Sequence, residues 1–89
     1  MIEKEVEIVN RLGLHARAAA KLVHLAGGYD SEVELVRDNE QVDAKSILGI
    51  LMLAAPEGTR LTVRCEGRDE TEACEAVADL FARGFDEEG

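Results

Sequence analysis

Residues 13–17 combine a glycine, a histidine and an arginine at a point where a turn is expected to give way to an alanine-rich helix. The His15 imidazole is the candidate nucleophile, and Arg17 follows it by two positions. The first N–H groups of a helix lack partners within the helix, and the helix dipole places partial positive charge there. A phosphoryl group on His15 would therefore be stabilised by the backbone N–H groups of Ala16 and Arg17. The Arg17 fork could add two hydrogen bonds to the same phosphate.

Simpler interpretations of these residues stay open at this point. A histidine at a helix start can serve only as a cap, and so can Ser46 before the second expected helix. The alanines after Arg17 either leave the surface open to a partner or let the helix pack closely on a sheet. His24 lies on the same helix without a helix end or an arginine beside it, so it is interpreted as a surface histidine.

The hydrophobic pattern predicts the elements that must position this site. Apolar residues alternate with charged ones over 2–8, 32–35 and 60–66, which predicts strands, and 40–44 is expected to form a short returning strand. Helical spacing predicts a helix over 16–26, whose expected buried face comprises Ala16, Ala19, Ala20, Val23 and Ala26, with Leu22 beside it. Ser46 before the apolar run 47–53 and Pro56 after it favour a brief helix.

The last helix is expected to begin at Asp69, with Glu72 completing a capping box, and to end at Arg83 and Gly84. The tail 85–89 is expected to be loose. Strands 2–8 and 32–35 expose glutamates, whereas strand 60–66 exposes Arg60 and Arg64. Placing the arginine strand between the other two would pair opposite charges on both sides.

Composition limits the classes of function. The chain has 89 residues, which predicts one small domain over 1–89, and a net charge of -9, which argues against a DNA or RNA partner. The acidic start and the lack of a long apolar run predict a cytoplasmic protein without membrane insertion. Cys65 and Cys74 lack metal-ligand spacing and are expected to pack as small apolar residues, so neither a metal nor a cofactor is expected.

The segment Gly13-Leu14-His15-Ala16-Arg17 resembles the active-site motif of the HPr family, the histidine-containing phosphocarriers of the bacterial phosphoenolpyruvate-dependent phosphotransferase system. A second segment, 44–53, is similar to the family's signature around a regulatory serine. The resemblance covers essentially the whole chain. It implies an α+β open-faced β-sandwich with the order β-α-β-β-α-β-α, in which three helices cover one face of a four-stranded antiparallel sheet of order 1-4-2-3.

The resemblance also implies a relay. Enzyme I, phosphorylated by phosphoenolpyruvate, would pass the group to Nδ1 of His15, which would hand it to an enzyme IIA domain, with Arg17 as a phosphate ligand. Ser46 would be the site at which an HPr kinase/phosphorylase acts. Such a chain is a monomeric carrier with a covalent phosphohistidine and not an autonomous enzyme, because one histidine and one arginine offer no second base and no pocket. The residues expected to dock partners are Ala20, Ile47, Leu48 and Leu51.

Two departures from the family pattern bear on the partners. Ala18 stands where most members carry proline, in the first helical turn, where proline is tolerated. Members that serve sugar transport tend to carry lysines along the first helix and near the second, whereas this chain has His24, Gly27 and Gly49. The ending of the chain is also similar to that of the nitrogen-related paralogue. Sugar uptake and a nitrogen-related or purely regulatory role, exerted by partner binding, therefore stay alternatives.

Overall fold

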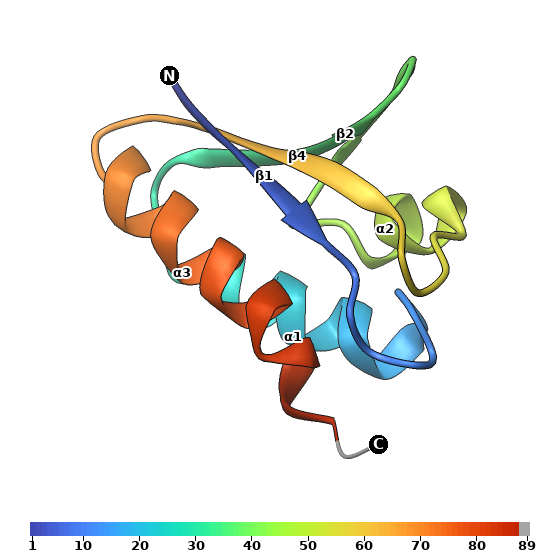
Figure 1. Ribbon diagram of the computed structural model, residues 1–89. Helices are drawn as coiled ribbons and strands as arrows, with labels where there is room; N and C mark the ends of the chain where they lie inside the picture. Colours follow the sequence, from blue (N-terminus) through green and yellow to red (C-terminus); the bar gives the residue numbers. More distant parts are fainter. Residues whose placement is uncertain (88–89) are drawn as a thin grey trace.

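A computed structural model describes residues 1–87 and shows a four-stranded sheet covered on one face by three helices (Figure 1). The strands are β1 (Ile2–Glu7), β2 (Glu32–Arg37), β3 (Glu40–Asp43) and β4 (Arg60–Glu66), and the helices are α1 (Ala16–Gly27), α2 (Ile47–Leu53) and α3 (Glu70–Ala82). The strand order is β1-β4-β2-β3, and each neighbouring pair is antiparallel. The expected fold class, element order and sheet order are confirmed.

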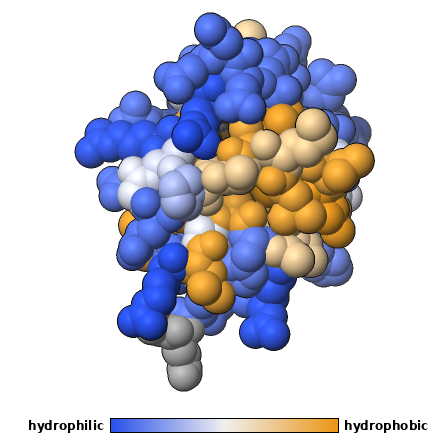
Figure 2. Space-filling view, turned by 90° about the vertical axis from the view of Figure 1, so that its right-hand side faces the viewer, coloured by the Kyte–Doolittle hydropathy of each residue, from blue (hydrophilic) through white to orange (hydrophobic). Residues whose placement is uncertain are grey.

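Charge pairs across the open face agree with the expected position of β4. Arg64 lies opposite Glu3 on β1 and Glu34 on β2, with Nε 2.8 Å from Glu3 Oε2 and Nη1 3.8 Å from Glu34 Oε1. Such exposed pairs contribute at most about 1 kcal/mol each, so the register depends mainly on the alternating buried residues. On the side of the molecule where α2 lies, the surface carries a broad hydrophobic area bordered by hydrophilic residues (Figure 2).

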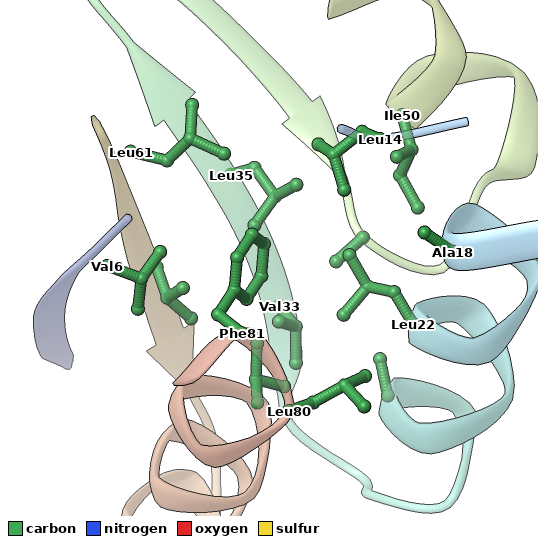
Figure 3. Close-up of a cluster of buried hydrophobic side chains, with 14 of the residues drawn as sticks. Val6, Leu14, Ala18, Leu22, Val33, Leu35, Ile50, Leu61, Leu80 and Phe81 are labelled. Atoms are coloured by element: carbon green, nitrogen blue, oxygen red, sulfur yellow. The ribbon is translucent and has the colours of Figure 1, made fainter. Parts of the chain in front are cut away.

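The core fills the space between the sheet and the helices. Leu35 on β2 and Leu22 on α1 are fully buried, and Phe81 on α3 lies between them (Figure 3). The core is otherwise aliphatic, with Phe81 and Phe85 as its two large aromatic side chains. Cys65 and Cys74 are free and buried, which confirms that they pack as small apolar residues.

The buried face of α1 matches the expected one at Ala19, Leu22 and Ala26, and Val23 is half-buried against the core, but the rest of the expected face differs. The structure buries Ala18, Ala19, Leu22 and Ala26 and leaves Ala16 and Ala20 exposed. A run of alanines offers no contrast of polarity from which a face can be chosen. The large side chain of Leu22 decides it instead, since positions four residues before and after it share its face.

The start of α3 also differs from the expectation. Asp69 is the N-cap residue but makes no capping hydrogen bond with its side chain, so the expected capping box with Glu72 is wrong. The Asp69 carboxylate accepts hydrogen bonds from the N–H groups of Asp30 and Ser31, each at 2.9 Å, and from the Ser31 hydroxyl. These bonds tie the start of α3 to the segment that enters β2, and they lower the Asp69 pKa to about 2, with the bond from the Ser31 hydroxyl as the main cause.

The segment after α3 is ordered where a loose tail was expected. Gly84–Asp86 form a turn of 3₁₀ helix, and the Phe85 ring is fully buried with its centroid 4.9 Å from that of Phe81. An apolar anchor of this size outweighs the tendency of a chain terminus to fray. Residues 88–89 of the expected loose tail lie outside the described residues. Within 1–87, no helix combines the length and the apolarity needed to cross a membrane.

Candidate functional site

The loop between β1 and α1 presents His15 through a set of close backbone contacts. Gly13 is buried at φ +68°, and a Cβ atom at this position would lie 2.5 Å from the Ala55 carbonyl oxygen. The same oxygen accepts the Leu14 N–H at 3.0 Å, so the loop after α2 holds the segment that precedes α1. The buried Asn10 amide donates from Nδ2 to the Gly13 carbonyl at 2.8 Å. The loop conformation thus places His15 directly at the helix start.

His15 is the N-cap residue of α1, as expected. Its backbone is extended, with φ -84° and ψ 179°, and its ring turns back so that Nδ1 accepts the Arg17 N–H at 3.3 Å. The side chain is 27% exposed, so the ring is partly accessible at the surface. The Arg17 N–H and the positive end of the helix dipole therefore face Nδ1, an arrangement suited to phosphate binding at a helix start.

Arg17 projects from the first turn of α1 and is exposed. Its guanidinium forms neither a hydrogen bond nor an ion pair with another residue of the described part of the chain. Because a guanidinium can donate two hydrogen bonds to one phosphate, an unengaged fork beside His15 is suited to receive an anion there. Ala16, whose N–H is the first of the helix, is exposed beside it.

Glu87 approaches the other nitrogen of the His15 ring, a contact that the sequence interpretation missed. Glu87 Oε2 contacts His15 Nε2, and Glu87 Oε1 accepts the second Nδ2 hydrogen bond of Asn10 at 3.0 Å. Burial alone would raise the pKa of the Glu87 carboxyl. The hydrogen bonds from His15 and Asn10 outweigh that effect, so the pKa lies below its ordinary value and the carboxylate is ionised at neutral pH. The apolar Phe85 in the tail was the available sequence signal that this segment is anchored.

Ser46 caps α2, with its hydroxyl oxygen accepting the Gly49 N–H at 3.1 Å. Ile47, Leu48 and Leu51, expected to dock partners, are 44%, 70% and 36% exposed. Met52 and Leu12, which the sequence interpretation did not include, are 70% and 68% exposed. Ala20 is exposed on α1, while His24, interpreted as a surface residue, is exposed further along that helix. We name the exposed residues of α2 the α2 patch, and Figure 2 views the molecule from its side; the patch consists of Ile47, Leu48, Leu51 and Met52.

Comparisons with known proteins agree with this geometry. A family model described as "PTS HPr component phosphorylation site" matches residues 2–83. The chain is 49% identical to Phosphocarrier protein HPr of Cupriavidus necator over 98% of each chain. It resembles a crystal structure of HPr from Thermoanaerobacter tengcongensis at a TM-score of 0.95, with 43% identity and full coverage of both chains. A crystal structure of the Bacillus subtilis catabolite repression protein Crh, described as a swapped dimer, is similar at a TM-score of 0.77, with 39% identity over 94% of this chain and 97% of that one.

Proposed function

The chain belongs to the HPr family of phosphocarrier proteins, and from this premise we propose that it carries a phosphoryl group on His15 from phospho-enzyme I to an enzyme IIA domain. The observation that supports the proposal most directly is the position of Nδ1, which lies at the start of α1 beside an N–H group and an unengaged arginine. The chain acts as a monomeric shuttle in the cytoplasm and needs no cofactor.

The surroundings of Nδ1 suit reversible transfer. At 3.3 Å the hydrogen bond from the Arg17 N–H is long, so it is easily exchanged when the Nδ1 lone pair attacks phosphorus. The N–H groups of Ala16 and Arg17 then donate to phosphoryl oxygens, and the guanidinium of Arg17 adds charge-assisted bonds. Because the site is open, the next protein in the relay can reach the phosphoryl group.

The α2 patch supplies the docking surface. The loop that follows α2 accepts the Leu14 N–H through the Ala55 carbonyl, and α1 packs against α2, so we expect the patch to lie near His15. Exposed apolar side chains beside a reactive group are typical of a surface that other proteins bind. Ala20 extends this surface along α1, where its small side chain lets a partner approach closely.

The test is incubation with enzyme I and phosphoenolpyruvate, read by intact mass. We expect wild type to gain one acid-labile phosphoryl group, His15→Ala to gain none, and His24→Ala to behave like wild type as the matched control. Arg17→Ala should slow transfer roughly tenfold to a hundredfold, as the loss of a charge-assisted bond in the transition state would. Equal losses in His15→Ala and His24→Ala would contradict the assignment of His15.

We further propose that phosphorylation of Ser46 by an HPr kinase/phosphorylase regulates docking. The Ser46 hydroxyl lies at the start of α2, directly before the α2 patch. A phosphate on it would add a charge of about -1.5 to -2 next to the docking surface. Ser46→Asp can still cap α2, so its circular dichroism should match wild type while its apparent affinity for enzyme I falls. This loss of affinity should shrink as the salt concentration rises, because ions screen the added charge. Wild-type acceptance by Ser46→Asp at low salt would limit Ser46 to a capping role.

The alternative is a nitrogen-related or regulatory protein that acts by binding partners through the α2 patch. The structural similarity to Crh, described as a Bacillus subtilis catabolite repression protein, supports this alternative. The same assay separates the two functions, because a regulator of this kind binds its partner without gaining mass. Light scattering of the purified chain tests the proposed monomeric state.

A further inference from the structure

We propose that Glu87 is a positioning residue for His15: its carboxylate holds a proton on Nε2, so that Nδ1 presents a lone pair, and it neutralises the charge that the ring gains on phosphorylation. The contact between Glu87 Oε2 and His15 Nε2 carries this inference. The inference rests on the proposed function, because it concerns the same histidine and the same transfer.

The two ring nitrogens of His15 face partners of opposite kind. Nδ1 receives the N–H of Arg17, and only an unprotonated nitrogen can accept that bond. Nε2 faces a carboxylate, which has no proton to donate when ionised, so Nε2 must carry the proton of this contact. Both contacts select the same tautomer, with the hydrogen on Nε2 and the lone pair on Nδ1.

The carboxylate is held firmly where it meets the ring. Its side chain is 14% exposed, and Asn10 Nδ2 donates to its other oxygen at 3.0 Å. Phe85, two residues earlier, is fully buried, and Lys21 Nζ donates to the Phe85 carbonyl at 2.6 Å. Since Asn10 also binds the Gly13 carbonyl, one amide joins the loop before His15 to the segment that carries Glu87. A carboxylate fixed in this way orients the ring without a cost in side-chain freedom at each transfer.

The transfer step balances with the proton left in place. The Nδ1 lone pair forms the N–P bond while the bond from phosphorus to the donor protein's leaving atom breaks, and that electron pair goes to the donor. The Nε2 proton stays on the ring, which gains one formal positive charge, and the ionised Glu87 offsets it across their hydrogen bond. On donation a nucleophilic atom of the acceptor protein forms a bond to phosphorus while the N–P electron pair returns to Nδ1, and the ring is again neutral beside the same carboxylate.

The first experiment reads the tautomer of the unphosphorylated full chain from the ¹⁵N chemical shifts of the His15 ring. We expect Glu87→Ala to give a mixture of tautomers and Glu87→Gln to keep less of the Nε2–H form than wild type, because its amide offers only one acceptor oxygen to two donors, His15 Nε2 and Asn10 Nδ2. Asp86→Asn is the matched control, since the Asp86 carboxylate lies on the same segment but pairs with Arg83 Nε at 3.0 Å. A wild-type tautomer in Glu87→Ala would overturn the inference.

The second experiment measures phosphorylation by enzyme I and phosphoenolpyruvate in the same proteins. Glu87→Ala should accept the group roughly tenfold to a hundredfold more slowly, the loss expected for one charge-assisted hydrogen bond, with a smaller loss in Glu87→Gln and none in Asp86→Asn. Glu87→Gln at the wild-type rate would overturn the role of the charge. If wild type itself gains no phosphoryl group, the proposed function fails, while the ring tautomer still decides whether Glu87 positions His15.

Discussion

Replacing Gly13 by alanine should destabilise the fold more than the same change at Gly58 or Gly27. Gly13 has φ +68°, and an alanine Cβ would meet the Ala55 carbonyl oxygen at 2.5 Å and the Pro56 Cα at 3.0 Å. A left-handed conformation costs an L residue about 1 to 2 kcal/mol. Overpacking against backbone that cannot rotate away costs about 1 to 3 kcal/mol more. We therefore expect a loss of roughly 2 to 5 kcal/mol in the free energy of unfolding.

Two other glycines separate these contributions. Gly58 has φ +90°, but no heavy atom lies within 4 Å of the position of its Cβ, so Gly58→Ala should cost only the conformational part, about 1 to 2 kcal/mol. Gly27, the last residue of α1, has neither a positive φ nor a neighbour within 4 Å, so Gly27→Ala should be neutral or stabilising by up to about 1 kcal/mol.

Urea unfolding and thermal melts of the three variants measure this order. For a domain of this size, each kcal/mol shifts the melting temperature by about 4 to 8 °C, so the variants are readily resolved. Gly13→Ala should also lose phosphoryl acceptance beyond its unfolded fraction, because the Ala55 contact fixes the loop that presents His15. A Gly13→Ala protein as stable as Gly58→Ala would refute the reasoning, since the close approach to Ala55 would then not contribute to the free energy of unfolding.

Three further predictions concern other parts of the fold. Because the Asp69 pKa is lowered to about 2 in the folded chain, its stabilisation is present above its ordinary value of 3.8 and is lost as pH falls toward 2. The stability gap between wild type and Asp69→Asn, measured by denaturant titration, should thus close over that interval, and a gap independent of pH would contradict it. Burial, the largest cause, and the neighbouring Cys74 raise the pKa of Cys65 to about 12, and both cysteines are buried. A thiol reagent at pH 8 should therefore label neither cysteine in the native chain and both after denaturation. Rapid labelling of the native chain would show that the core opens. Ala18→Pro should melt at the wild-type temperature or slightly above it, because the His15 ring accepts the Arg17 N–H and not that of Ala18, whereas a fall of about 10 °C or more would show that the proline ring clashes with the core.

The elements and the position of His15 could be predicted from the sequence because their signals are local. Alternation defines the strands, Ser46 marks the start of α2, and Arg60 and Arg64 indicate which strand lies between two glutamate-bearing neighbours. The position of Glu87 could not be predicted in this way, because 72 residues separate it from His15 and a single glutamate in a polar tail has no periodicity. Only the tertiary packing of Phe85 brings it to the ring.

Asp69 illustrates a second limit of sequence patterns. An aspartate before a helix, with a glutamate three positions later, fits a capping box, yet here the same carboxylate binds Ser31 and the backbone beside it. Gly67 allows this approach, since a Cβ at that position would lie 2.7 Å from Ser31 Cα. A local sequence motif cannot reveal that a residue distant in sequence competes for the same hydrogen bonds.

The link that Asn10 makes between the first loop and the final segment has a consequence for biosynthesis. Asn10 leaves the ribosome well before Glu87, which lies 77 residues later in the chain. A nascent or proteolytically shortened chain that stops at Ala82 contains the four strands and three α-helices of residues 1–87, but its histidine ring lacks the carboxylate at Nε2. The contacts around the reactive ring are therefore complete only once the segment that carries Glu87 has been made and has packed, so a chain that stops before it would present His15 to partners without this carboxylate.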